Sequence, residues 1–208
     1  MRGKFITLEG MDGAGKSTHL QWLVQFLQAR GITVRATREP GGTTLGERLR
    51  ELLLDRNQQL HPETETLLMF AGRREHIEKI IVPALNSGAW VLCDRFTDAT
   101  YAYQSGGSGV AWSKVAQLEQ WAHQHLQPDL TLLFDVTPEV GRQRAREDRT
   151  SDRFEREESA YFARVREAYL RRAQAHPDRI RIVDAGQSLS VVRKALEDIL
   201  TSYCYNIG

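Results

Sequence analysis

The sequence has few cysteines and no long hydrophobic run. Among its 208 residues only two are cysteine, Cys93 and Cys204, and their wide separation gives no disulfide pattern. Disulfide-poor sequences are typical of reducing compartments, so a cytoplasmic protein is expected. No apolar stretch approaches the roughly 20 residues that a membrane-spanning helix needs, and the first residues carry no signal-peptide pattern. A membrane protein is therefore not expected.

The sequence also lacks an excess of either charge. Its 28 basic and 27 acidic side chains give a net charge of +1, which provides no electrostatic case for binding a nucleic acid or an anionic membrane. Lysine is scarce, because only five of the 28 basic residues are lysine. The many arginines suit planar, bidentate recognition of phosphate, although most are expected to be solvated surface.

No linker, repeat or low-complexity stretch divides the chain, so a single domain spanning residues 1–208 is predicted. Five short apolar runs are typical of strands, and helical patterns separate them, as in a mostly parallel sheet with helical crossovers. The runs cover residues 4–9, 32–37, 89–93, 130–136 and 179–183. The predicted fold class is α/β.

A glycine-rich motif, Gly10-Met-Asp-Gly-Ala-Gly-Lys-Ser-Thr18, follows the first predicted strand. Its glycines let backbone N–H groups surround a polyphosphate without a Cβ in the way, and the next helix offers its N-terminal amides to the same anion. Lys16 can reach the terminal phosphates, and Ser17 can place its hydroxyl on a magnesium ion. The motif predicts a nucleotide phosphate site formed by Gly10, Met11, Asp12, Gly13, Ala14, Gly15, Lys16, Ser17 and Thr18.

Polar and glycine-rich residues follow other predicted strands as well. Arg38-Glu-Pro-Gly-Gly-Thr43 follows the second run, Asp94-Arg95 the third, and Asp184-Ala-Gly-Gln187 the last. The carboxyl ends of parallel strands share one edge, where ligands bind. Asp94 is placed like a magnesium-binding Walker B carboxylate, and the two arginines suit phosphate. The alternatives are a strand that meets its helix cap and an ordinary strand-to-helix connection.

Residues 61–86 show a long helical pattern in which Phe70 and Arg73 are three apart and share a face. These two side chains could hold a flat ring between stacking and hydrogen bonding. A core-plus-surface helix is an equally good interpretation. Farther along, Tyr103 could wall off a sugar or could simply pack in the core.

Five arginines, mixed with acidic residues, gather between residues 142 and 153: Arg142, Arg144, Arg146, Arg149 and Arg153. Such a run is usually a solvated helix with ion pairs. Here Thr150-Ser151-Asp152 interrupts the helical pattern, which favours a mobile lid over about 142–156 that brings arginine to a phosphoryl group.

Together these features resemble bacterial thymidylate kinases, and the resemblance runs nearly end to end. It is carried by the segments Gly10–Thr18, Arg38–Thr43, Leu67–His76, Asp94–Phe96, Tyr103–Gln104, Pro128–Asp135 and Asp152–Glu155. Many enzymes share the glycine loop, but Arg-Glu-Pro-Gly-Gly together with Asp-Arg-Phe is specific. The resemblance implies a P-loop NTPase-like fold, a five-stranded parallel sheet with helices on both faces, a homodimer, and phosphorylation of dTMP to dTDP by ATP and Mg²⁺ in dTTP biosynthesis.

The resemblance also implies roles for individual residues. Those implied to act in catalysis are Lys16, Arg95 and Arg153. Those implied to lie at the metal are Ser17, Asp94 and Glu9, and those implied to join the glycine loop at ATP are Arg149 and Gln187. The residues implied to hold dTMP are Glu9, Arg38, Phe70, Arg73, Arg95, Tyr103 and Gln104.

Two positions differ from patterns found in the family. The aromatic residue that stacks on the base often lies four residues before the arginine, where this chain has Met69. Members with an arginine inside the glycine loop differ from this chain, which has Gly13 there. The resemblance therefore implies that a catalytic arginine comes from the lid.

Two other functions fit part of the pattern. A deoxynucleoside kinase, or another nucleoside monophosphate kinase, shares the glycine loop and an arginine-rich lid, although a nucleoside kinase needs no second phosphate-binding arginine at position 38. A GTPase-like switch would need an Asn-Lys-x-Asp motif to read guanine, and no such string occurs.

Overall fold

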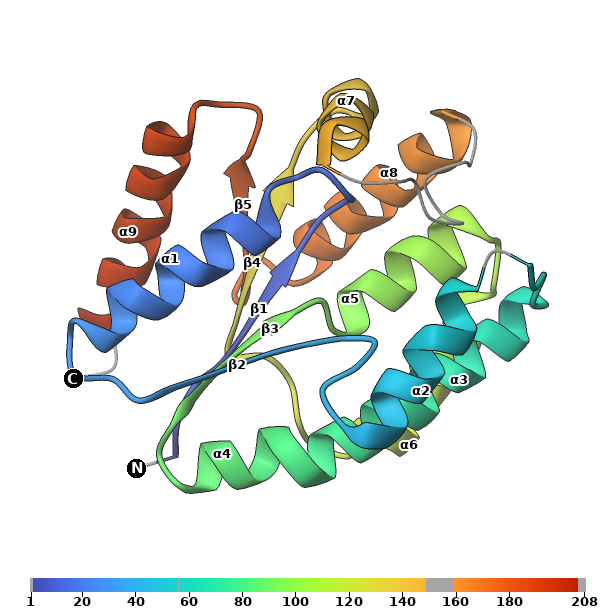
Figure 1. Ribbon diagram of the computed structural model, residues 1–208, viewed down its shortest axis with the longest axis horizontal. Coiled ribbons are helices and arrows are strands. Elements are labelled where there is room, and N and C mark those ends of the chain that lie inside the picture. The colour runs from blue at the N-terminus through green and yellow to red at the C-terminus, as the bar shows by residue number, and fades with distance from the viewer. Residues whose placement is uncertain (1, 56, 149–158, 206–208) are drawn as a thin grey trace.

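The computed structural model describes residues 2–55, 57–148 and 159–205, which form a sheet between two layers of helices (Figure 1). The five strands are parallel, in the order β2-β3-β1-β4-β5. Their bounds are β1 (Phe5–Glu9), β2 (Val34–Arg38), β3 (Trp90–Asp94), β4 (Leu130–Asp135) and β5 (Ile180–Asp184). The predicted five-stranded parallel sheet is confirmed, and each strand lies within two residues of its expected bounds.

Helices cover both faces of the sheet. On one side lie α1 (Lys16–Gln28) and α9 (Leu189–Tyr205), and on the other lie α4 (Val82–Asn86), α5 (Thr97–Thr100) and α8 (Ser159–Ala175) (Figure 1). The other helical elements are α2 (Thr44–Leu54), α3 (Pro62–His76), α6 (Trp112–His123), α7 (Pro138–Asp148) and the π-helical segments η1 (Ile77–Ile81) and η2 (Tyr101–Gly107). Within the described ranges no helix is long and apolar enough to cross a membrane.

The central strand β1 is buried on both faces, as strands of a covered parallel sheet are. Because side chains alternate along a strand, Ile6 and Leu8 join the core cluster that contains Leu23 of α1. Phe5 belongs to a second cluster, with Ile81 of η1. This alternation also decides where the last residue of the strand, Glu9, must lie.

The expected long helix over residues 61–86 is present as α3, η1 and α4 in succession. Pro83 in the first turn of α4 has no N–H to donate to the preceding turn, which suits the wider π-helical turn at η1. The wide turn buries Ile77 and Ile81 beneath the sheet.

The glycine loop between β1 and α1 packs tightly against the end of β4 and the start of α7. Gly10 and Gly13 have φ angles of 133° and 76°, which L side chains rarely adopt. A Cβ at Gly10 would lie 2.3 Å from the Phe134 carbonyl oxygen, and one at Gly13 would lie 2.0 Å from the Gly141 carbonyl oxygen. These two glycines are thus required by the packing of the loop, in addition to any ligand.

Candidate active site

The loop after β1 borders a cavity at the carboxyl ends of the strands, which we call the loop cavity. Its walls are Asp12–Gln21, the end of β2, the end of β3, and the β5–α9 connection with Gln187. Gly10 and Met11 do not line it, since Met11 lies in the core. The structure therefore brings Asp12–Thr18 and Gln187 together around one cavity, as expected, and leaves Gly10 and Met11 behind its wall.

Lys16 is buried and stretched across its own loop. Its Nζ donates to the Gly10 carbonyl oxygen at 3.0 Å and to the Met11 carbonyl oxygen at 2.9 Å. Burial, together with the charge of Arg95, lowers the pKa of Lys16. The ammonium thus lies in the loop cavity, where oxygens of a polyphosphate would meet it.

Asp94 and Ser17 provide oxygen atoms to the same cavity. Asp94 Oδ1 is buried and has no hydrogen-bond partner among the described residues, which is costly for a carboxylate. Magnesium is usually held by one or two carboxylates together with phosphate oxygens and water. The two residues therefore fit a magnesium ion, even though the described residues contain no cluster of three or more metal-ligating side chains.

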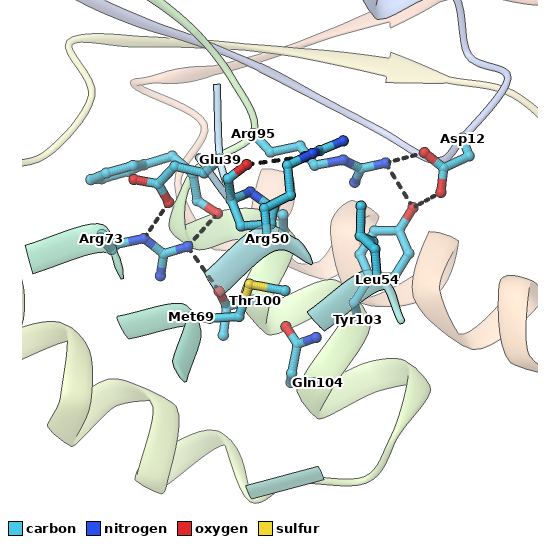
Figure 2. Close-up of a pocket in the computed structure, with 13 residues that line it drawn as sticks. Asp12, Glu39, Arg50, Leu54, Met69, Arg73, Arg95, Thr100, Tyr103 and Gln104 are labelled. Carbon is cyan, nitrogen blue, oxygen red and sulfur yellow. Dashed lines mark hydrogen bonds and ion pairs between the residues drawn. The ribbon is translucent and has the colours of Figure 1, made fainter. Parts of the chain in front are cut away.

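Arg95 occupies the junction between the loop cavity and a second, smaller pocket (Figure 2). Its guanidinium donates to Asp12 Oδ1 at 2.6 Å, to the Tyr103 hydroxyl at 3.0 Å and to the Tyr169 hydroxyl at 3.2 Å. Its backbone has a φ of 70°, an uncommon conformation for a residue with a Cβ. Arg95 and Asp12 line both spaces, so groups bound in the two would meet at this pair.

The second space, which we call the small pocket, lies between α2, α3, α5 and η2. It is lined by Asp12, Glu39, Pro40, Arg50, Leu54, Met69, Arg73, Arg95, Phe96, Ala99, Thr100, Tyr103 and Gln104. Arg73 and Asp12 lie at opposite ends of the pocket, with Tyr103 and Gln104 along one side (Figure 2). Arg73, Arg95, Tyr103 and Gln104 are thereby brought together, as the sequence predicts.

Arg73 is almost fully buried and is held in place on three sides. Its Nε donates to Glu39 Oε2 at 2.7 Å, and its Nη2 donates to the Phe96 carbonyl oxygen and to Thr100 Oγ1. Glu39 is fixed in turn by His76 Nδ1 at 2.9 Å. Arg73 Nη1 is buried without a partner among the described residues, so this residue of the pocket wall keeps one unused donor.

Phe70 does not line the small pocket, and Met69 does. Phe70 lies in a core cluster with Tyr101, Val110 and Val115. Its ring still contacts the Arg73 guanidinium, 4.7 Å from the ring centroid. Neighbouring helix residues point about 100° apart, and here Met69 faces the pocket while Phe70 faces the core. Of the two residues, Met69 and not Phe70 therefore lines the small pocket.

Arg38 also lies outside the small pocket. It lines the loop cavity, is half exposed, and pairs with Glu47 at 2.8 Å. Besides Arg95, a second arginine borders both spaces: Arg50, on α2, whose Nη1 donates to the Pro40 carbonyl oxygen at 3.0 Å. Sequence reasoning missed Arg50, because it lies inside an ordinary amphipathic helix and no motif marks it.

Glu9 lines neither space, in contrast to the expectation that it contacts the sugar and the metal. It is fully buried, and its Oε1 accepts from the Phe96 backbone N–H at 2.7 Å. Its Oε2 accepts from the Tyr169 hydroxyl at 2.9 Å. The alternation of β1 places Glu9 on the same face as Phe5, beneath α8. Glu9 therefore supports the turn that holds Arg95, and a role at the sugar and the metal stays a prediction.

Burial, and secondarily the nearby charge of Asp98, raise the pKa of Glu9 from 4.5 to about 7. Between these values the native state binds a proton that the unfolded chain has released, so this group lowers the free energy of unfolding as pH rises. A Glu9→Gln variant has no carboxyl group to titrate there, so its free energy of unfolding lacks this dependence on pH. We expect its stability, relative to wild type, to increase from pH 4.5 to 7 and to level off above pH 7, as measured by urea unfolding. A pH-independent difference for Glu9→Gln would contradict the assignment.

The arginine-rich run falls partly outside the described residues. Arg149 and Arg153 both lie there, so their places in the site stay predictions. Of the arginines that precede them, Arg144 lines the loop cavity and donates to the Ala185 carbonyl oxygen at 2.7 Å. Arg142 donates to Ser159 Oγ at 3.2 Å. The described start of the expected lid, in α7, therefore borders the loop cavity through Arg144.

The fold and the site define a class: an α/β protein of the P-loop NTPase type, with a second pocket that meets the phosphate loop at Arg95. The comparisons name the family within this class. The family model for thymidylate kinase matches residues 8–196, and the chain therefore belongs to the thymidylate kinase family.

Individual relatives agree with this family over almost their whole length. The thymidylate kinase of Nitrosomonas europaea is 60% identical over 202 residues, which cover 97% of this chain and 94% of that protein. The thymidylate kinase of Methylobacillus flagellatus is 58% identical, with 98% and 99% covered. The crystal structure of thymidylate kinase from Ehrlichia chaffeensis superimposes with a TM-score of 0.79 at 33% identity, covering 97% of this chain and 99% of that one.

Proposed function

We propose that the two connected spaces hold the two substrates of a phosphoryl transfer, ATP in the loop cavity and dTMP in the small pocket. As a member of its family, the chain is an ATP-dependent phosphotransferase that converts dTMP to dTDP. The observation that carries the placement is the shared boundary, because Asp12 and Arg95 line both spaces. A phosphate of each substrate would meet there.

The small pocket suits a pyrimidine nucleotide. Arg73 Nη1, the unused buried donor, would hydrogen-bond to a carbonyl oxygen of thymine, and Met69 would pack against the ring. Tyr103 would crowd the 2′ position of the sugar, so that a ribonucleotide fits poorly. Arg95 and Arg50 would hold the phosphate of dTMP, in the position first expected of Arg38.

The loop cavity suits the triphosphate of ATP. Backbone N–H groups of the glycine loop, Lys16 and the start of α1 would bind the phosphates, and Gln187 would lie near the nucleoside. Asp94 and Ser17 would hold magnesium, which when bound neutralises charge on the phosphate oxygens. This chain's own cations, Lys16 and Arg95, then stabilise the charge that develops between donor and acceptor.

The transfer needs no general base. The second pKa of a phosphate monoester is about 6, so an oxygen of dTMP is already anionic at neutral pH. That oxygen forms a bond to the γ-phosphorus, the bond from the γ-phosphorus to the β–γ bridging oxygen breaks, and ADP leaves with the electron pair.

We propose that a lid over residues 142–156 carries Arg149 and Arg153, which join Lys16 and Arg95 at the phosphates. We also propose that residues 1–208 form one domain.

We also propose that the protein is a homodimer through the face formed by α3 and α6. These helices pack against each other, and each exposes a large apolar side chain, Leu67 on α3 and Trp121 on α6. Tryptophan in particular is enriched in interfaces relative to the rest of the protein surface. The free thiols Cys93 and Cys204 are in keeping with the cytoplasm, which we propose as the compartment.

The function is tested by a coupled assay over nucleoside monophosphates, with ATP and magnesium and with thymidine as a further acceptor. We expect dTMP to be the best acceptor, dUMP to follow, and AMP, CMP and thymidine to be poor. Efficient phosphorylation of thymidine or of a ribonucleotide would contradict the placement of dTMP in the small pocket.

A further inference from the structure

A buried carboxylate lies behind the small pocket, outside the residues that line it. Glu65, in the first turns of α3, accepts a hydrogen bond from Gln104 Nε2 at 2.8 Å. Both side chains are only 2% exposed. Gln104 lines the pocket and Glu65 does not, so Glu65 can influence the substrate site through Gln104.

The chemistry of this contact fixes the orientation of the Gln104 carboxamide. An ionised carboxylate has no proton to donate, so it can receive only the NH₂ group of the amide. The carbonyl oxygen of Gln104 must then turn away from Glu65. In Figure 2 that oxygen lies on the side of Thr100 and Met69, within the pocket. The Gln104 carboxamide can in principle donate or accept a hydrogen bond, and Glu65 thus leaves it as an acceptor toward the pocket.

An acceptor at this place discriminates between pyrimidines. Thymine and uracil have an N3–H donor next to the O4 carbonyl oxygen, whereas cytosine has an N3 acceptor next to an N4 amino group. Two residues of the pocket wall supply the complementary pair, an acceptor on Gln104 and the unpartnered donor Nη1 on Arg73. Cytosine would place acceptor against acceptor and donor against donor, which leaves buried polar groups unpaired.

We propose that Glu65 is a positioning residue for base selection, which makes the enzyme choose an N3–H pyrimidine by locking the Gln104 carboxamide. The proposal rests on the placement of dTMP in the small pocket. A purely structural role is the competing explanation, since the same hydrogen bond joins α3 to η2. The two explanations predict opposite changes in the turnover of dCMP when Glu65 is replaced. Lost structure would lower the turnover of every substrate, whereas a carboxamide that is free to rotate would raise the turnover of dCMP.

The first test is Glu65→Gln in the full-length enzyme. The carboxamide introduced at position 65 can either accept from Gln104 or donate to it, so Gln104 can rotate to suit either base. We expect kcat/KM for dCMP to rise about tenfold or more and to remain below that for dTMP, since Arg73 still opposes the N4 amino group. The value for dTMP should stay within about threefold, because dTMP restores the original orientation at small cost.

The matched control is Glu63→Gln, two residues earlier on α3, where the carboxylate is exposed and pairs with Lys114. We expect this variant to leave both substrates unchanged. A fall of both kcat/KM values in Glu65→Gln, or no change in either, would overturn the proposal. Urea unfolding of each variant shows whether the fold is retained.

A swap variant, Glu65→Gln with Gln104→Glu, keeps the proposal testable if the single variant does not fold. The carboxamide at position 65 can then donate to the carboxylate at position 104, whose second oxygen still faces the pocket as an acceptor. The preference for dTMP over dCMP should therefore be kept, and a swap variant that uses dCMP as well as dTMP would overturn the proposal.

A Gln104→Met variant distinguishes failure of the Glu65 proposal from failure of the proposed function on which it rests. If this variant leaves the ratio of kcat/KM for dTMP to that for dCMP unchanged, the small pocket does not recognise the base, and the placement of dTMP there is wrong.

Discussion

An Arg95→Lys variant is expected to lose about 10²–10³-fold in kcat/KM for dTMP, the range found when a positioned donor is removed from a transition state. Arg95 donates to Asp12, Tyr103 and Tyr169 and borders both spaces. Lysine keeps the positive charge, but its ammonium group lacks the planar guanidinium that donates to three fixed partners at once. The positive φ of this position is uncommon for either residue, so the backbone cost is the same in both.

The measurement is steady-state transfer together with calorimetric binding of dTMP. Arg74→Lys is the control, since Arg74 is partly exposed and pairs with Glu78 along one helix face. It should leave both quantities unchanged. An Arg95→Lys enzyme within about threefold of wild type would show that neither phosphate meets this guanidinium.

A Lys16→Met variant is expected to fold and to lose about 10³-fold or more in kcat, as when a charge that stabilises phosphoryl transfer is removed. Lys16 Nζ is the cation at the centre of the glycine loop, held by the carbonyl oxygens of Gly10 and Met11. Methionine is similar in length and fills the same space, and it removes the cost of burying the charge, which lowers the pKa of Lys16. The loss should therefore lie in transfer and not in folding.

Single-turnover transfer and urea unfolding separate these two effects. Lys114→Met provides the control, because Lys114 is exposed on α6, pairs with Glu63, and lines neither space, as is also true of Glu63. Near wild-type turnover in a folded Lys16→Met enzyme would exclude the glycine loop as the phosphate site.

Much of the fold was determined by local sequence patterns. The alternation of short apolar runs and helical patterns was enough to predict five parallel strands to within two residues. The glycine loop was predictable because its motif lies between a strand pattern and a helix pattern, and the positive φ angles found at Gly10 and Gly13 favour glycine. Asp94 and Arg95 were found because the end of a buried strand fixes their place at the sheet edge. These features depend on neighbours in the sequence.

The tertiary structure alone decided which side chains face the two spaces. The sequence places Phe70 and Met69 on one helix, but only the packing of α3 against α6 and η2 turns Met69 toward the pocket. Arg50 joins the site because α2 folds back over the strand ends. Glu9 points inward because α8, about 160 residues away, supplies the Tyr169 hydroxyl that pairs with its carboxylate. Such contacts are set by how separate elements pack, and no local pattern encodes that packing.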